Sequence, residues 1–136
     1  MDCIFCRIVK GEIPSYKIYE DKNYLAFLDI SQFTPGHTIV IPKKHLEFIW
    51  DSKEIGKYFG IVKKIARHFR SLGYTFVDSL TFGRKVPHAH VHLVPHNGNS
   101  LNYKKALERL GDLQSDTTRH PSPELGKKLV KKFKVV

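Results

Sequence analysis

Three histidines, His88, His90 and His92, alternate with apolar residues. In a β-strand, alternate side chains share a face at a spacing of about 6.6 Å, so one face would carry imidazoles and the other apolar groups. Neutral imidazole is nucleophilic toward phosphorus near pH 7, and neighbouring histidines can exchange protons in that range. Attack on a phosphate ester or anhydride would give a phosphoramidate intermediate that water then opens. Because imidazoles also bind metals, the spacing alone leaves a catalytic and a metal-binding interpretation open.

The two cysteines of the chain, Cys3 and Cys6, are separated by two residues. They are too few to stabilise a fold through several disulfide bonds, and their spacing is typical of metal binding or redox exchange. The pair alone does not distinguish these possibilities. It favours a reducing compartment, so we expect a cytoplasmic protein.

The formal net charge of +10 is shared by two parts of unequal length. Residues 1–100 contain 14 Lys and Arg against 9 Asp and Glu, and residues 101–136 contain 9 against 4, so each part carries +5. Such a charge concentrates polyanions without specifying a fold or a chemistry. No apolar run approaches the roughly 18 residues of a membrane span, and we expect no membrane association.

Hydrophobic patterning predicts strands at residues 24–30, 37–41, 74–77 and 89–95. Between the second and third of these, apolar residues recur every three or four positions and predict one long helix. This order predicts an α+β domain with a mainly antiparallel sheet over residues 1–100.

The predicted long helix begins with Asp51 as its N-cap and ends near Gly73. Its apolar face is expected to consist of Ile55, Phe59, Val62, Ala66 and Phe69.

Residues 101–136 are expected to form a basic, helical C-terminal extension outside that domain. Tyr103 and Leu110 share one face of a possible short helix, and Ser122 followed by Pro123 is a typical helix start.

The sequence resembles the histidine triad (HIT) family, whose signature alternates three histidines with hydrophobic residues. Several further segments resemble blocks of that family, in the same order, over about the first hundred residues. They are Cys3–Ile8, Gly11–Pro14, Ala26–Ile30, Pro35–His37 and Val40–His45.

The resemblance implies a five-stranded antiparallel sheet with one long and one short helix, paired into a homodimer through that helix and the sheet. It also implies that His90 is the nucleophile and that His92 contacts the α-phosphate and assists the leaving group. His88 would orient the site or bind a metal.

The resemblance further implies a pocket for a purine nucleotide. Asp29 would accept hydrogen bonds from the ribose hydroxyls. The other residues expected around the nucleoside are Phe5, Ile8, Ile13, Ile30 and His37.

The loop before the triad departs from the common family pattern. Asp78 stands where many members carry Asn, and Arg84 and Lys85 replace a Gln and a small hydroxyl residue. These residues and Gly83, whose amide can approach a phosphate, are expected to bind nucleotide. Two cations here suit a substrate with more negative charge than a simple phosphoramidate, unless both point to solvent.

In some HIT proteins a Cys-x-x-Cys pair binds zinc together with two histidines. The matching positions here are Cys3, Cys6, His45 and His88, a set typical of a closed structural zinc site. His96 and His120 are alternatives to His88.

The resemblance implies a nucleotidyl hydrolase or transferase acting on nucleoside phosphoramidates, dinucleoside polyphosphates or other adenylylated substrates. One alternative is a nucleotide-binding regulatory protein with little catalysis. Another is removal of AMP from nucleic-acid ends, as in the aprataxin branch, which the basic extension would favour. That branch carries a zinc finger with cysteine ligands after the triad, and residues 101–136 contain no cysteine. Nucleic-acid binding is therefore not expected.

Overall fold

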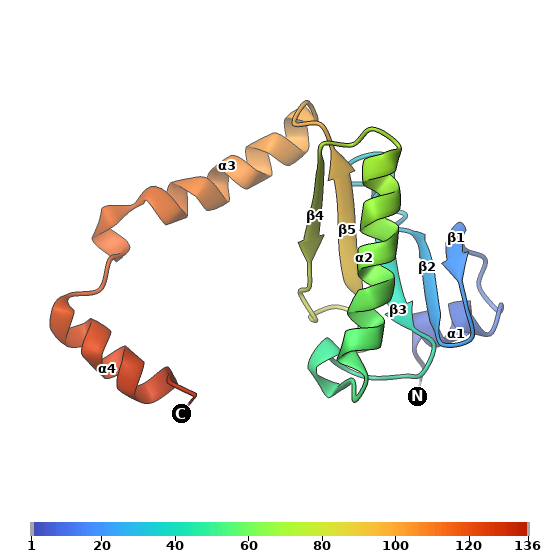
Figure 1. Cartoon of the computed structure of the whole chain (residues 1–136), viewed down its shortest axis with the longest axis horizontal. Coiled ribbons are helices and arrows are strands. Elements are labelled where there is room, and N and C mark those ends of the chain that lie inside the picture. The colour runs from blue at the N-terminus through green and yellow to red at the C-terminus, as the bar shows by residue number, and fades with distance from the viewer. Residues whose placement is uncertain (1, 136) are drawn as a thin grey trace. The chain divides into compact units, whose positions relative to one another are not determined.

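The computed structural model describes residues 2–135, which form two compact units, residues 2–100 and residues 101–135. The first unit contains a sheet with helices on its faces. In the second, the described residues form helices joined by irregular segments (Figure 1).

Five antiparallel strands form one sheet in the order β1-β2-β3-β5-β4. The predicted α+β class with a five-stranded antiparallel sheet is therefore confirmed. The strands are β1 (Lys17–Glu20), β2 (Tyr24–Leu28), β3 (Thr38–Pro42), β4 (Phe76–Leu80) and β5 (Val91–His96).

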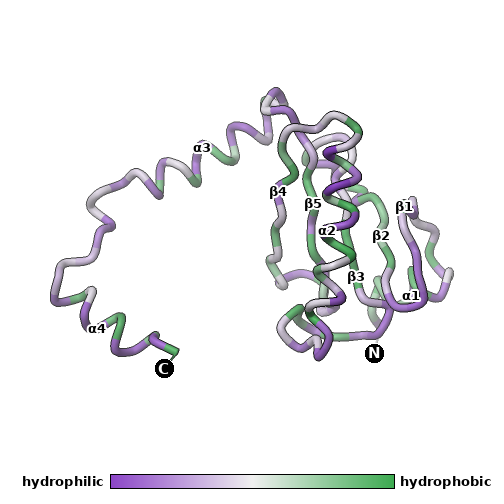
Figure 2. The backbone as a smooth tube through the Cα atoms, in the orientation of Figure 1, coloured by the Kyte–Doolittle hydropathy of each residue, from purple (hydrophilic) through white to green (hydrophobic). Residues whose placement is uncertain are grey.

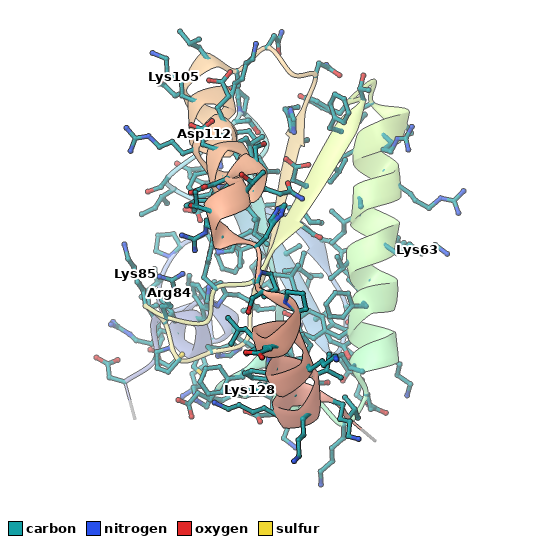
Figure 3. All side chains as sticks on the ribbon, turned by 90° about the vertical axis from the view of Figure 1, so that its left-hand side faces the viewer. Lys63, Arg84, Lys85, Lys105, Asp112 and Lys128 are labelled. Carbon is teal, nitrogen blue, oxygen red and sulfur yellow. The ribbon has the colours of Figure 1, made fainter. Side chains whose placement is uncertain are left out.

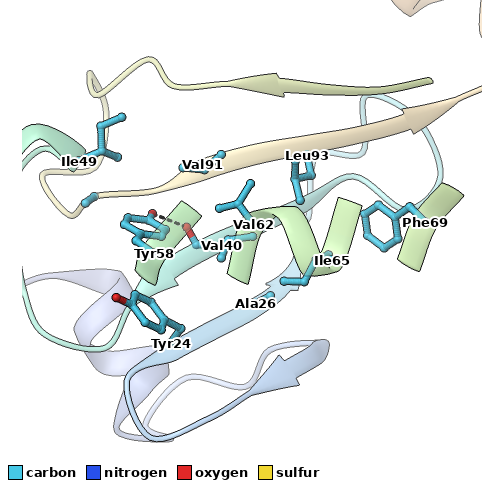
Figure 4. Close-up of a cluster of buried hydrophobic side chains, with 11 residues drawn as sticks. Tyr24, Ala26, Val40, Ile49, Tyr58, Val62, Ile65, Phe69, Val91 and Leu93 are labelled. Atoms are coloured by element: carbon cyan, nitrogen blue, oxygen red, sulfur yellow. Dashed lines mark hydrogen bonds between the residues drawn. The ribbon is translucent and has the colours of Figure 1, made fainter. Parts of the chain in front are cut away.

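One face of the sheet packs against the long helix α2 (Ile55–Ser71). Alternate strand residues such as Val40 and Leu93 point to this face because side chains alternate along a strand. They meet Val62 and Phe69 of the helix (Figure 4). The hydroxyl of the buried Tyr58 donates a hydrogen bond to the carbonyl of Val40 at 2.7 Å, which fastens α2 to the central strand.

The opposite face of the sheet packs against the short helix α1 (Ile4–Val9). Leu25 and Ile39 contribute to this second core, and Phe5 and Ile8 cover it from the helix. The histidines of the triad lie on this side, because the residues between them belong to the first core.

The predicted start of the long helix is wrong. Asp51 ends the 3₁₀ turn Ile49–Asp51, where its carboxylate accepts from the backbone N–H of Phe48, and Ser52 has an extended backbone. The helix therefore begins at Ile55 after Glu54.

The helix face that is buried also differs in part from the prediction. Val62 and Phe69 are buried as expected, but Tyr58 and Ile65 complete the face, while Ile55 and Phe59 stay exposed.

The bounds of the four predicted strands also differ from the prediction by one to three residues, and two of these differences concern the site. β4 runs through Leu80 and so includes part of the expected loop. β5 begins only at Val91, so His88 and His90 precede the strand. Their backbone is still held near the sheet, because the N–H of Ala89 donates to the carbonyl of Leu46 at 2.6 Å.

The second unit contains α3 (Leu101–Ser115), the 3₁₀ turn Thr117–Arg119 and α4 (Pro123–Phe133). Ser122 caps α4 as expected, accepting from the N–H of Leu125 at 3.2 Å. Both helices alternate hydrophobic and hydrophilic positions (Figure 2). Within the described residues, no helix has the length and apolar character of a membrane span.

Candidate functional site

Two cysteines and two histidines converge where α1 begins. Cys3 is the N-cap of α1, and Cys6 lies in its first turn. The sulfur of Cys6 lies 3.2 Å from Nδ1 of His45 and 3.5 Å from Nδ1 of His88. The sulfur of Cys3 lies 3.4 Å from Nδ1 of His88, and the two imidazole nitrogens are 3.3 Å apart.

These four ligand atoms fit a tetrahedral zinc ion. Bond lengths of about 2.0–2.3 Å give tetrahedral edges of roughly 3.3–3.8 Å, close to the separations observed. The tautomer of His88 also fits, since its Nε2–H donates to the carbonyl of Pro42 at 2.8 Å and leaves Nδ1 with a free lone pair. Burial lowers the pKa of His88, which keeps this imidazole neutral at pH 7. The set could hold a structural metal, with His88 as its fourth ligand.

A second group, Asp29, His37 and His92, fits a metal less well. Nε2 of His37 and Nδ1 of His92 lie 2.9 Å apart, which is a hydrogen-bond distance shorter than a tetrahedral edge. The carboxylate of Asp29 is 3.7 Å from both rings. We therefore interpret His37 and His92 as a hydrogen-bonded relay, with the carboxylate of Asp29 beside it but beyond hydrogen-bond distance of either ring.

His90 has a defined tautomer. Its Nδ1 lies 2.7 Å from the carbonyl oxygen of His88, and a carbonyl only accepts, so Nδ1 carries the proton. Nε2 is then the nitrogen that can offer a lone pair to phosphorus or to a proton. Phe5 packs edge-on against the imidazole at 5.2 Å between ring centroids, which fixes the orientation of the ring. His90 is therefore arranged as a nucleophile or a base.

His92 is neutral at pH 7. Burial lowers its pKa to about 4, aided by the neighbouring rings of His90 and His37 and opposed by Asp29. The pKa of His37 is also lowered, mainly by burial. These two imidazoles therefore share a hydrogen bond rather than a positive charge.

The tautomer of His92 depends on the hydrogen bond that Nδ1 of His37 makes. When the N–H of Phe33 donates to Nδ1 of His37, at 3.2 Å, Nε2–H of His37 donates to His92. Nε2 of His92 is then protonated and is a donor. When Nδ1–H of His37 instead donates to the carbonyl of Ser31, at 3.1 Å, Nε2 of His92 becomes an acceptor. His37 can thus set the hydrogen-bonding role of His92.

A cavity of about 710 Å³ opens beside His90 and His92. Its wall is mostly apolar and comes from α1, β2, β3, β5 and the loops that follow α1, β2 and β4. Of the residues expected to bind nucleotide, those lining it are Phe5, Ile8, Ile13, Asp29, Ile30, Arg84 and Lys85.

Three residues expected around the nucleotide are not among the lining residues of this cavity. His37 is fully buried behind His92 because the strand turns its ring inward. Asp78 belongs to β4, where its carboxylate accepts from Nε2 of His96 at 2.9 Å. Gly83, at a φ of 64°, borders a separate cavity of about 50 Å³ instead.

The cavity also contains aromatic residues that sequence reasoning missed. Phe82 packs edge-on against His92, with ring centroids 5.7 Å apart, and Phe33 lies parallel to the same ring at 6.3 Å. Tyr16 contributes from the segment before β1. The exposure that marks them, 71% for Tyr16 and 49% for Phe82, is a property of the structure, and no motif in the sequence identifies these residues.

The remaining histidines are separate from the metal set. His96 hydrogen-bonds Asp78, His120 belongs to the second unit, and His68 is exposed on α2 as expected. The cysteine pair therefore meets His45 and His88, rather than either proposed alternative.

The sequence comparisons agree with this geometry. Residues 10–99 match the HIT domain. The chain belongs to the HIT family. It is 39% identical over 137 residues to Protein hit of Bacillus subtilis, with 94% of each chain covered.

Two other HIT proteins bear on chemistry and metal content. The adenosine 5'-monophosphoramidase of Schizosaccharomyces pombe is 35% identical over 99 residues, which cover 70% of this chain and 74% of that enzyme. The crystal structure of a Zn-bound histidine triad family protein from Mycobacterium smegmatis is 32% identical, with a TM-score of 0.64. The superposition covers 83% of this chain and 98% of that one.

Proposed function

We propose that this HIT protein is a nucleotidyl hydrolase or transferase that cleaves a bond at the α-phosphate of a purine nucleotide. Its substrates would be nucleoside phosphoramidates, dinucleoside polyphosphates or other adenylylated molecules. The single observation that carries the proposal is the orientation of His90, whose Nδ1–H is fixed on the carbonyl of His88 beside a nucleotide-sized cavity.

In the first step, the lone pair of Nε2 of His90 forms a bond to the α-phosphorus while the bond to the leaving group breaks. His90 becomes a positively charged nucleotidyl-imidazole, and the carbonyl of His88 stabilises it by accepting from Nδ1–H. In the second step, water attacks phosphorus and the bond to Nε2 breaks, which restores neutral His90.

His92 is the group best placed to manage protons. It lines the cavity together with His90, at 5.1 Å between ring centroids. A bound phosphate anion would raise the pKa of His92, because an opposite charge favours the protonated form. His92 would then donate to the leaving group and accept a proton from the attacking water.

The cavity wall suits a nucleoside. Phe5, Ile8 and Ile13 offer apolar surface for a base, and Asp29 offers carboxylate oxygens to ribose hydroxyls. One oxygen of Asp29 accepts from the N–H of Ser31 at 2.8 Å, which holds the carboxylate in place.

Cys3, Cys6, His45 and His88 would hold zinc, a metal that supplies a structural crosslink at such a closed site. It would fasten α1 to the segment that carries His88, whose carbonyl orients His90. Two thiols that bind metal rather than each other also suit a reducing compartment, so we propose a cytoplasmic location.

We further propose a homodimer formed through α2 and the sheet. Ile55 and Phe59 are exposed on α2, and Phe76 is exposed on β4, an edge strand of the sheet. Apolar side chains at a helix and a strand edge are typical of a subunit contact.

Stereochemistry tests the covalent mechanism. An AMP-linked substrate with a chiral thiophosphate at the α-position should be converted with retention of configuration, because two in-line displacements each invert phosphorus. His90→Ala should still bind AMP while losing several powers of ten in rate. Inversion by the unmodified protein would refute a nucleotidyl-His90 intermediate. Nucleotide binding without turnover of any adenylylated substrate would instead support a regulatory protein.

A further inference from the structure

We propose that Arg84 and Lys85 make this protein select substrates whose leaving group is anionic, such as a phosphate chain or a carboxylate-bearing amine, over those whose leaving group is cationic. The inference rests on the proposed cleavage at the α-phosphate and adds the charge of the departing group.

The placement of the two cations is the first observation. Arg84 and Lys85 lie in the loop between β4 and β5 and line the same cavity as His90 and His92. Figure 3 shows them next to each other, on the opposite side of the view from Lys63 of α2. Any group that leaves the α-phosphate must depart within the field of these two charges.

The second observation is that Arg84 is held near the histidines without being neutralised. Its guanidinium lies over the ring of Phe82 at 5.8 Å, and Phe82 in turn contacts the ring of His92. Among the ion pairs of the described residues, none includes Arg84 or Lys85.

Asp29 is the acidic residue among those lining the cavity, and its carboxylate faces His37 and His92. With Arg84 and Lys85 positive and Asp29 negative, the charged residues that line the cavity carry a formal net charge of +1. A substrate that brings additional negative charge past the α-phosphate would meet an attractive field, and an ammonium group would meet a repulsive one.

The expected size of the preference follows from Coulomb's law. Two unit charges several ångströms apart near a protein surface interact strongly enough to change a rate by about tenfold, which corresponds to about 1.4 kcal/mol. Because both side chains are exposed, salt should weaken this preference.

A second role for these cations must be distinguished from this one. If they only bound the oxygens of the α-phosphate, they would help every substrate equally. A comparison of substrates that share AMP and the same type of P–N bond separates the two roles.

The experiment uses three AMP phosphoramidates, made with β-alanine, propylamine and ethylenediamine. Their leaving groups have nearly the same length and end in a carboxylate, a methyl group and an ammonium group. The measured quantity is the ratio of kcat/KM for the anionic substrate to that for the cationic one. When this ratio is compared between the unmodified protein and a variant, the intrinsic reactivity of each amine cancels, because it is the same with both proteins.

Loss of one cation should weaken the attraction of the anionic substrate and the repulsion of the cationic one by about tenfold each. Arg84→Gln and Lys85→Gln should therefore each lower this ratio by up to about a hundredfold, and the double variant should lower it further. Lys63→Gln, which removes an exposed cation of α2, should leave the ratio unchanged. In the unmodified protein, raising the salt concentration from about 0.05 M to about 0.5 M should also lower the ratio, since the Debye length falls. This salt test requires no substitution.

Equal losses for all three substrates would show a clamp on the α-phosphate and overturn this inference alone. An unchanged ratio in the double variant, together with a salt-independent ratio in the unmodified protein, would also overturn it. Failure of the unmodified protein to cleave any of the three phosphoramidates or a dinucleoside polyphosphate, while it binds AMP, would overturn the proposed function and this inference with it.

Discussion

Replacing His92 with Asn should weaken the dependence of stability on pH. In the folded protein the pKa of His92 is about 4, because burial and two neighbouring imidazoles disfavour its charge. In the unfolded chain it returns to about 6.5. Between these values the unfolded state binds a proton that the folded state does not, so stability falls as the pH falls. The full contribution is present above pH 6.5 and is lost as the pH approaches 4.

The size of the effect follows from the two pKa values. Linkage gives almost no loss at pH 7 and a loss of about 2 kcal/mol at pH 5 from this residue. That is a change of roughly thirtyfold in the ratio of folded to unfolded protein. The side chain of His92 is 11% exposed, so solvent screening reduces this figure little.

Urea denaturation at pH 7 and at pH 5 measures the effect. The stability of the unmodified protein minus that of His92→Asn should shrink by about 2 kcal/mol over this interval. Using this difference removes the contributions of other groups, including the proposed zinc ligands, that titrate in both proteins. The matched control is His68→Asn, on the exposed side of α2, which should leave the pH dependence unaltered. Parallel curves for His92→Asn and the unmodified protein would refute the low pKa.

Three further perturbations test other parts of the structure. Cys6→Ser should reduce bound zinc well below one ion per chain and lower the Tm by about 10 °C; a zinc-free unmodified protein in elemental analysis would contradict the metal site. His37→Phe keeps an aromatic ring beside Phe33 but removes the partner of His92, so kcat should fall at least tenfold and the free energy of unfolding by about 1–3 kcal/mol; an unchanged kcat would exclude the relay. Truncation after Ser100 should leave a folded HIT domain with measurable turnover, and loss of its circular dichroism spectrum would show that the extension completes the core.

Hydrophobic patterning along the chain predicted those strands whose residues are buried in an uninterrupted run. The segments around Leu25 and Val40 are continuous apolar runs, and both form central strands as predicted. β1 was missed because most of its residues are exposed, which leaves little hydrophobic signal. The predicted start of α2 is too early because the periodicity of apolar residues gives no sign of the extended backbone at Ser52, which separates Asp51 from the helix.

The sequence by itself determined which residues are the candidates for the chemistry. Alternation put His88, His90 and His92 on one side of an extended segment, with the intervening apolar residues in the core, since side-chain direction along such a backbone is a local property. The HIT family blocks identified the family for the same reason, because they are contiguous in the chain.

Only the tertiary structure decided how those histidines divide their roles. Cys3 lies 85 positions from His88, yet its sulfur meets Nδ1 of that ring while the Pro42 carbonyl takes Nε2–H. The burial of His37 behind His92 and the pairing of Asp78 with His96 were likewise fixed by strand packing. Tautomer, pKa and cavity access depend on which atoms surround a side chain in space, and residue spacing along the chain does not specify them.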